Sequence, residues 1–260
     1  MLHSLCKAGI AAALAASALA AGAATVVATY NFDSTLAALE SGAPSLVAID
    51  PLGLNGFESA VVFGNTQQVY HWVGDGSDPL TQAGLKLDTT GLLTYNNYSI
   101  ELVFEFLELP KFGGGWRRIV DTQNRQSDNG FYVSPDNVLQ VYPVVDGTTE
   151  FTPGFHSVVL SNYVVDGVRE VKAYLDGALE LTSDTDQLNL DNASNPDHLL
   201  NFFVDNFGFA PNEYADGRIA YMRLYDGVVV PVPEPGSFAL VLPALALVGW
   251  AARTRRRVNT

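Results

Sequence analysis

Asp205, Asn206 and Glu213 form the combination of residues best suited to bind a metal ion. Asp205 and Asn206 follow the apolar segment 199–204, and Glu213 lies eight residues after Asp205, across a loop. Carboxylate and amide oxygens are the ligands that calcium takes in proteins, and a loop can bring several of them together. The spacing predicts a calcium site, and an ordinary acidic turn is the alternative.

Trp72 and Trp116 are the candidates for binding a sugar ring. Trp116 follows three consecutive glycines, and Trp72 precedes the polar stretch 74–78. An exposed indole stacks on the C–H groups of a pyranose, while nearby carboxylates and amides bind its hydroxyl groups. The two positions predict glycan binding, and burial of the ring at the end of a strand is the alternative for each.

Glu101, Glu105 and Glu108 would support glycoside hydrolysis only if two of their carboxylates met. A strand places Glu101 and Glu105 about 13 Å apart and turns Glu108 to the opposite face. Glycosidases need a separation of roughly 5–9.5 Å between their two carboxyl groups. We therefore expect these glutamates on a solvated outer face, without a catalytic role.

Other catalytic patterns are missing from the sequence. The histidines after residue 23 show no zinc-binding spacing, and no serine stands in a Gly-x-Ser-x-Gly motif. The sequence therefore predicts a protein without enzymatic activity. The three histidines are His71, His156 and His198.

Short strands must position these side chains. The clearest is 98–107, in which Ile100, Leu102 and Phe104 point to one side and the glutamates to the other. Six Asp-Gly pairs supply the positive φ that tight hairpins need. Only residues 34–40 have a weakly helical pattern. About a dozen strands of this kind predict an all-β fold, a two-sheet antiparallel sandwich.

Five of the strand segments follow one another in a recognisable order, namely 98–104, 118–121, 130–133, 173–177 and 217–226. Their succession resembles the laminin-G-like, concanavalin-A-like jelly roll. The resemblance implies one such domain over residues 24–229, with a structural calcium ion, which is common in domains of this kind. The Glu-x-Asp-x-Glu motif of the laminarinase-like enzymes in the same superfamily is absent.

The C-terminal segment combines three parts with different physical properties. The stretch Val232-Pro233-Glu234-Pro235 must stay extended, because proline fixes φ and lacks an amide donor. The apolar run 237–252 would span about 24 Å as a helix, slightly less than the ~30 Å hydrocarbon core of a membrane. A basic cluster then marks the cytoplasmic side. It consists of Arg253, Arg255, Arg256 and Arg257.

The succession of Pro-Glu-Pro, a short apolar helix and arginines resembles the PEP-CTERM sorting signal of Gram-negative bacteria, here residues 230–260. The resemblance implies a single transmembrane sorting helix and an exosortase that cuts near the Pro-Glu-Pro motif. The enzyme then releases the protein or re-attaches it outside the inner membrane. A plain C-terminal membrane anchor is the alternative.

Residues 1–23 have the features of a signal peptide. Lys7 precedes the Ala/Leu-rich run 8–20, and Ala21-Gly22-Ala23 offers the small residues that signal peptidase accepts. The only cysteine, Cys6, lies in this segment, so the mature protein has neither disulfides nor a thiolate metal site. We expect export to the cell surface or the extracellular matrix, with membrane contact only through the C-terminal helix.

The region between the two end segments is strongly acidic. Five of the 14 Lys and Arg lie in those segments, so residues 24–236 hold nine against 28 Asp and Glu, a formal net charge of −19. Such a surface repels nucleic acid and disfavours ion pairing with anionic polysaccharide. We expect stacking on neutral glycan or a calcium bridge to acidic glycan. A purely structural adhesion or biofilm-matrix protein is the alternative, and a glycoside hydrolase is a further one.

Overall fold

The computed structural model describes residues 24–107, 115–208 and 213–231, and fifteen β-strands follow one another along them. The bounds of the strands are β1 (Thr25–Tyr30), β2 (Val47–Ile49), β3 (Gly56–Val62), β4 (Asn65–Trp72), β5 (Gly84–Asp88), β6 (Tyr98–Phe106), β7 (Arg117–Asp121), β8 (Gly130–Val133), β9 (Val138–Tyr142), β10 (Val145–Glu150), β11 (His156–Val165), β12 (Val168–Leu175), β13 (Ala178–Ser183), β14 (Leu199–Phe202) and β15 (Gly217–Asp226).

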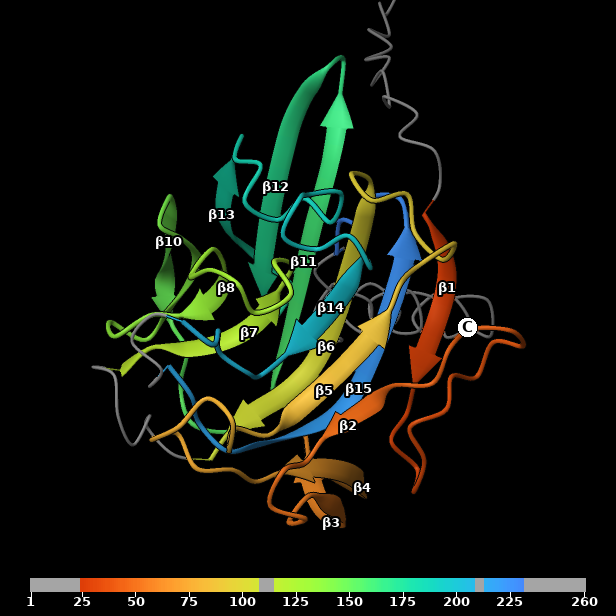
Figure 1. The fold of residues 1–260 in the computed structure, drawn as a ribbon, viewed down its shortest axis with the longest axis vertical. Coiled ribbons are helices and arrows are strands. Elements are labelled where there is room, and N and C mark those ends of the chain that lie inside the picture. Colours follow the sequence, from red (N-terminus) through yellow and green to blue (C-terminus); the bar gives the residue numbers. More distant parts are fainter. Residues whose placement is uncertain (1–23, 108–114, 209–212, 232–260) are drawn as a thin grey trace, which may run out of the picture.

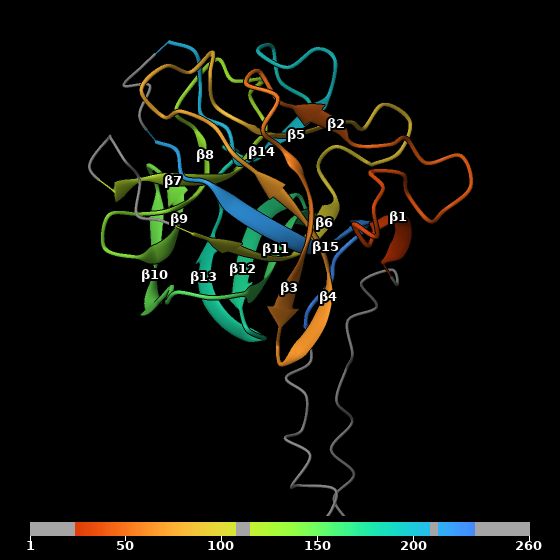
Figure 2. The same ribbon diagram turned by 90° about the horizontal axis from the view of Figure 1, so that it is seen from below.

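The strands form two antiparallel sheets. The first has eight strands in the order β13-β12-β11-β6-β15-β4-β3, with β1 also paired to β15. The second has seven strands in the order β10-β9-β8-β7-β14-β5-β2. Figure 1 labels strands of both sheets, and Figure 2 shows β2, β5 and β14 in one layer and β11, β12 and β13 in the other. The predicted all-β, two-sheet antiparallel sandwich is confirmed.

The alternation along β6 determines what each face of the eight-stranded sheet carries. Ile100, Leu102 and Phe104 are buried in the hydrophobic core between the sheets, as the sequence pattern predicts. Because successive side chains of a strand alternate, Val103 and its polar neighbours point away from the second sheet. We call this side of the eight-stranded sheet its outer face.

Two-residue turns with positive φ close the tightest hairpins. Asp166 and Gly167 (φ 51° and 79°) join β11 to β12, and Asp176 and Gly177 (φ 49° and 83°) join β12 to β13. These values suit the right-handed twist of the flanking strands, so the predicted Asp-Gly hairpin at Asp176 is confirmed.

Residues 34–40 form no helix, although the sequence shows a weak helical pattern there. Leu39 N donates a hydrogen bond to Thr29 O (2.8 Å), and the Glu40 carboxylate accepts hydrogen bonds from Thr29 N (2.5 Å) and Thr29 Oγ1 (2.8 Å). These bonds hold the segment against β1, so tertiary contacts outweigh its local propensity.

Several predicted features lie outside the described residues. They are the signal peptide 1–23, Glu108, and the sorting segment from residue 232 onward with its Pro-Glu-Pro motif, apolar helix and arginines. Within the described ranges, no helix is long and apolar enough to cross a membrane.

Candidate functional site

Three carboxylates meet where the loops next to β8, β14 and β15 come together. The ligating atoms of Asp128, Asp205 and Glu213 all lie within 4.8 Å of one another, and we call these residues the acidic cluster. The structure thus brings Asp205 and Glu213 together, in agreement with their predicted partnership. Asp128 is an addition, because it reaches the cluster only through the pairing of β7 with β14, which sequence spacing does not reveal.

A buried arginine lies beside the acidic cluster. The Arg118 side chain is fully buried, with Nη2 at 3.4 Å from Asp205 Oδ1 and Nη1 at 3.1 Å from Asp121 Oδ1. Asp121 also accepts a hydrogen bond from Asn201 Nδ2 (2.9 Å). Since Arg118 is shared between two carboxylates, it compensates at most one of the negative charges gathered here.

Asn206 contacts two of the carboxylates of the acidic cluster. Its Nδ2 donates hydrogen bonds to Asp128 Oδ1 and to Asp205 Oδ1 (3.1 Å), and its Oδ1 accepts one from Gly208 N (2.9 Å). An amide nitrogen is a hydrogen-bond donor and not a calcium ligand. An Asn ligates calcium through its amide oxygen, so the role of Asn206 as a ligand stays a prediction, and Asp128 supplies a third carboxylate.

Burial affects the ionisation of the acidic cluster. It raises the pKa of Asp205 to about 6, although the Arg118 charge acts in the opposite direction. Burial and the nearby Asp205 charge raise the pKa of Glu213 to about 8. Charge crowding in a partly buried site thus disfavours the ionised form of these carboxylates. Oxygen donors at this spacing fit calcium, which takes carboxylate oxygens at about 2.3–2.6 Å in flexible geometry.

Trp72 belongs to the core, which corrects its predicted role in ligand binding. Its side chain is 0% exposed, and its ring stacks on Phe203 with centroids 3.9 Å apart. The indole Nε1 donates to Ala215 O (2.9 Å). Gly217 makes room for the ring, because a Cβ there would lie 2.3 Å from Trp72 Cζ2. A fully buried indole offers no surface to a sugar.

Trp116 remains a candidate for ligand contact. It is half-buried, and its ring meets Tyr132 and Tyr142 edge to face, with centroids 5.6 and 5.1 Å away. The Arg118 guanidinium lies 4.7 Å from the centroid of the Tyr132 ring. Trp116 is therefore linked to the acidic cluster through Tyr132 and Arg118.

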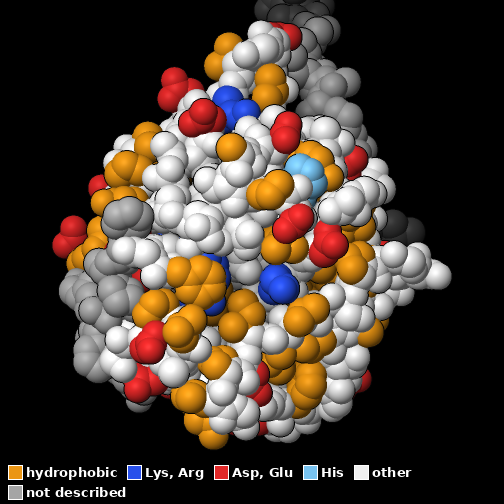
Figure 3. Space-filling view, in the orientation of Figure 1, with side chains coloured by type: hydrophobic (Ala, Val, Ile, Leu, Met, Phe, Trp, Pro, Cys, Tyr) orange, Lys and Arg blue, Asp and Glu red, His pale blue; other side chains and the backbone are white. Residues whose placement is uncertain are grey.

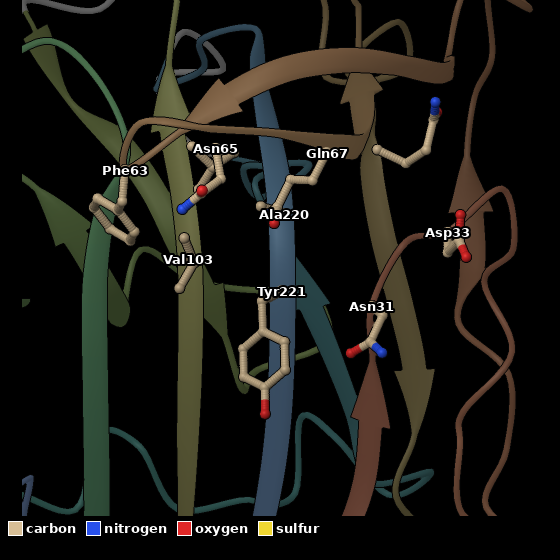
Figure 4. Close-up of a pocket in the computed structure, with 10 residues that line it drawn as sticks. Asn31, Asp33, Phe63, Asn65, Gln67, Val103, Ala220 and Tyr221 are labelled. Atoms are coloured by element: carbon tan, nitrogen blue, oxygen red, sulfur yellow. The ribbon is translucent and has the colours of Figure 1, made fainter.

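A hollow of about 600 Å³ lies on the outer face of the eight-stranded sheet (Figure 4), and we call it the outer groove. The β3–β4 hairpin, β6, β15 and the segment after β1 surround it. Small apolar residues at its base, Val103 and Ala220, pack with the hairpin residue Val62. The polar side chains that line it are Asn31, Asp33, Asn65, Gln67 and Gln68.

The outer groove combines unpaired amides with aromatic rings. Asn31, Asn65 and Gln67 are exposed, and their side chains have no hydrogen-bond partner among the described residues. Figure 4 shows Asn65 and Gln67 extending from the hairpin toward β6 and β15, the strand that carries Tyr221. Burial raises the pKa of Tyr221 to about 12, so its hydroxyl stays protonated at neutral pH. Phe63 is 60% exposed at the rim.

The glutamates of β6 already have partners. Glu105 is buried, contrary to the expected solvated position, because Arg218 Nη2 lies 2.7 Å from its Oε1. Glu101 accepts a hydrogen bond from the Tyr225 hydroxyl (2.7 Å). Within the described ranges, the acidic cluster is the group of metal-binding side chains that the structure brings together, and it contains no histidine.

The surface reflects the acidic composition. In the view of Figure 3, Asp and Glu side chains are scattered among hydrophobic ones, and Lys and Arg are few. The chain contains 28 Asp and Glu against 14 Lys and Arg. An anionic ligand is therefore repelled over most of the molecule.

The fold is similar to solved structures of toxin binding domains. One is the botulinum neurotoxin serotype C1 binding domain (12% identity, TM-score 0.51), and another is the binding domain of botulinum neurotoxin DC in complex with rat synaptotagmin II (12% identity, TM-score 0.50). Each match covers 79% of this chain and 49% of the other, so this protein spans about half the length of those chains. At such identity the likeness shows the fold alone, and the laminin-G-like assignment stays a prediction. No curated protein matches the sequence.

The C-terminal segment matches a known family model. Residues 231–257 match the PEP-CTERM protein-sorting motif. The matched range contains Pro233, Glu234 and Pro235, the apolar run, and all four arginines of the basic cluster. The chain therefore carries a PEP-CTERM sorting motif, which marks an exported protein whose membrane-anchored precursor is processed by an exosortase.

Proposed function

We propose that the sandwich is a non-catalytic glycan-binding domain that uses the outer groove. After processing, the protein would act at the cell surface or in the extracellular matrix of a Gram-negative bacterium. The observation that carries this proposal is the composition of the groove, in which amides without a partner among the described residues line the same hollow as Tyr221.

The chemistry of the outer groove suits a sugar chain. Carboxamides both donate and accept hydrogen bonds, so Asn31, Asn65 and Gln67 can each bind pairs of sugar hydroxyls. A tyrosine ring such as that of Tyr221 presents an apolar surface to pyranose C–H groups. With about 600 Å³, the groove has room for more than one sugar unit.

The charge of the groove favours a neutral glycan. Asp33 is the one charged side chain among the described residues that line it. A negative charge in an acidic protein repels uronates and sulfates, whereas neutral hydroxyls donate to a carboxylate readily. We therefore propose neutral polysaccharide as the ligand of this groove.

Calcium at the acidic cluster is a separate part of the proposal. Asp128, Asp205 and Glu213 would hold the ion, with Arg118 and Asn206 orienting the carboxylates. A bound ion would join the loops beside β8, β14 and β15 and would stabilise the nearby Trp116 region.

The proposal includes no catalysis. The paired glutamates that a glycosidase would need on β6 are engaged, Glu105 with Arg218 and Glu101 with Tyr225. A reducing-end assay on each glycan that binds would test this point, and release of reducing ends would contradict it.

Isothermal titration calorimetry with a panel of neutral oligosaccharides tests the groove. Tyr221→Ala and Gln67→Ala should each weaken the affinity of the best ligand by roughly fivefold or more, since a hydrogen bond or ring contact is worth about 1 kcal/mol. Gln126→Ala, an exposed loop position elsewhere, is the matched control and should bind as the wild type does.

The titration also distinguishes glycan binding from the main alternative, a structural role. If no neutral glycan binds the folded wild type, the groove proposal fails and a structural adhesion or matrix role takes its place. Binding that is unchanged in Tyr221→Ala would locate the glycan elsewhere.

A further inference from the structure

A second cavity is lined by a buried arginine that has no acidic partner among the described residues. It has a volume of about 310 Å³ and lies where the end of β6, the start of β7 and the segment between β10 and β11 meet. We call it the arginine cavity. Of the described residues, none lines both this cavity and the outer groove, so a ligand in the arginine cavity does not depend on the proposed glycan site. Its lining includes Phe106, Arg117, Asn137, Glu150, Phe151 and Thr152.

Arg117 is 5% exposed. Its guanidinium donates one hydrogen bond within the described residues, from Nη2 to Asn137 Oδ1, and its buried Nε has no partner there. The Phe106 ring lies 5.5 Å from the guanidinium carbon. Burial lowers the pKa of Arg117 to about 10, with no contribution from a carboxylate. The positive charge at Arg117 is thus desolvated, and no anion among the described residues compensates it.

The neighbouring buried arginines are compensated. Arg118 pairs with Asp121 and Asp205, and the charges of the same two aspartates act on Arg125. A buried charge without a partner costs stability, so a protein that keeps one needs a reason to do so. An anionic ligand that enters the cavity would provide the missing partner of Arg117.

The walls of the cavity indicate which kind of anion fits. Phe106 and Phe151 offer apolar ring surfaces, suited to the C–H face of a pyranose. Thr152 and the exposed Glu150 offer oxygen atoms to hydroxyl groups. The volume is at the lower end of the range for ligand pockets, which suits one sugar unit. A guanidinium binds a planar carboxylate through two parallel hydrogen bonds.

We propose that the arginine cavity binds the carboxylate of an acidic sugar, a uronic acid, through Arg117. This would let a strongly acidic protein hold an anionic glycan at one point without a bridging cation, although its overall charge opposes such binding. The ring of the sugar packs against the side of the cavity that Phe106 and Phe151 line, and Glu150 selects for a ligand with hydroxyl donors.

Calorimetric titration of the mature exported protein with glucuronate tests the proposal. Glucose serves as the neutral match and acetate as a carboxylate without a ring, and both should bind much more weakly than glucuronate. Arg117→Met should weaken glucuronate binding by about ten- to hundredfold, because a charged hydrogen-bonded pair is lost. The same variant should melt at an equal or higher temperature than the wild type, because it removes an unpaired buried charge.

Two further variants make the result decisive. Glu150→Gln removes the exposed carboxylate near Arg117 and should strengthen glucuronate binding by roughly two- to fivefold. Tyr221→Ala, in the outer groove, should leave glucuronate affinity unchanged. Equal affinity in wild type and Arg117→Met, or no glucuronate binding to folded wild type, would overturn the proposal. Should Arg117→Met fail to fold, unchanged affinity in Glu150→Gln would overturn it instead.

Discussion

Trp72 and Trp116 differ in their surroundings, and their removal should have different effects. Trp72→Ala empties a fully buried position against Phe203 and should lower the free energy of unfolding by about 3–5 kcal/mol. Trp116→Ala removes a half-buried ring and should cost roughly 1–2 kcal/mol. Urea denaturation of both variants measures the difference. Equal costs would contradict the assignment of Trp72 to the core and Trp116 to the surface.

The acidic cluster should respond to metal removal. If calcium binds Asp205 and Glu213, a chelator should lower the melting temperature by about 5–10 °C from its value at a calcium concentration ~100 times Kd, because a ligand bound only by the folded state stabilises it. Asp205→Ala should abolish this difference. The exposed Asp136→Ala is the control and should keep it. Identical melting of the wild type with and without chelator would reject the calcium site.

At the scale of single residues, the sequence predicts which side chains lie together better than it predicts what surrounds each of them. The spacing of Asp205 and Glu213 in one loop was sufficient to pair them. Arg117 and Arg118 are adjacent and identical in type, yet β7 turns them to opposite sides, so one lines a cavity and the other joins the acidic cluster. The alternation is local, but what each side of β7 faces follows from strand pairing, which the local sequence does not contain.

The elements with strong alternation are those that the sequence predicts well. The core pattern of β6 and the turn at Asp176-Gly177 agree with the structure. By contrast, Asp146-Gly147 lies inside β10, and the β3–β4 hairpin turns at Phe63-Gly64 (φ 48° and 84°). An Asp-Gly pair permits a tight turn without requiring one, and strand pairing decides where the chain reverses.

One carboxylate connects the edges of the two sheets. Glu180 of β13 accepts hydrogen bonds through Oε2 from Thr148 N (3.1 Å) and Thr149 N (2.8 Å) of β10. Burial opposes its ionisation, but the hydrogen bonds from Thr149 and Thr148 outweigh this effect and hold the pKa of Glu180 below its ordinary value of 4.5. The ionised form is therefore the one that stabilises the contact.

Glu180→Ala should lower the free energy of unfolding by about 1 kcal/mol at pH 7. Because the folded-state pKa lies below the unfolded value, the contribution is fully present above pH 4.5 and disappears as the pH falls through the folded-state pKa. Denaturation of wild type and variant across this range should show the two curves converge in acid. The exposed Asp184→Ala should track the wild type, and a gap that stays constant with pH would refute the role of Glu180.

For the whole molecule, the sorting motif predicts a specific processing event. Glu234→Ala should leave the precursor in the membrane fraction, because the matched Pro-Glu-Pro motif is altered. Mass spectrometry of the mature wild-type protein should find no peptide that contains Arg255. Recovery of an intact C-terminus through Thr260 from the extracellular fraction would contradict exosortase processing.

The layered architecture was predictable from the sequence, whereas the outer groove was not. Alternating strands and turn residues specify two sheets with a shared core. The outer groove depends on how the β3–β4 hairpin and the segment after β1 lie beside Tyr221, and these parts are far apart in the sequence. The arginine cavity depends in the same way on β6, β7 and the segment before β11.

The most direct test of the glycan-binding account is an NMR titration that observes side-chain amides. Neutral oligosaccharide is added to the ¹⁵N-labelled mature protein, and the carboxamide signals are followed. The account predicts shifts for Asn31, Asn65 and Gln67 of the outer groove, with the Gln126 and Asn189 signals unchanged. Shifts confined to residues outside the groove, or none with any neutral glycan, would contradict it.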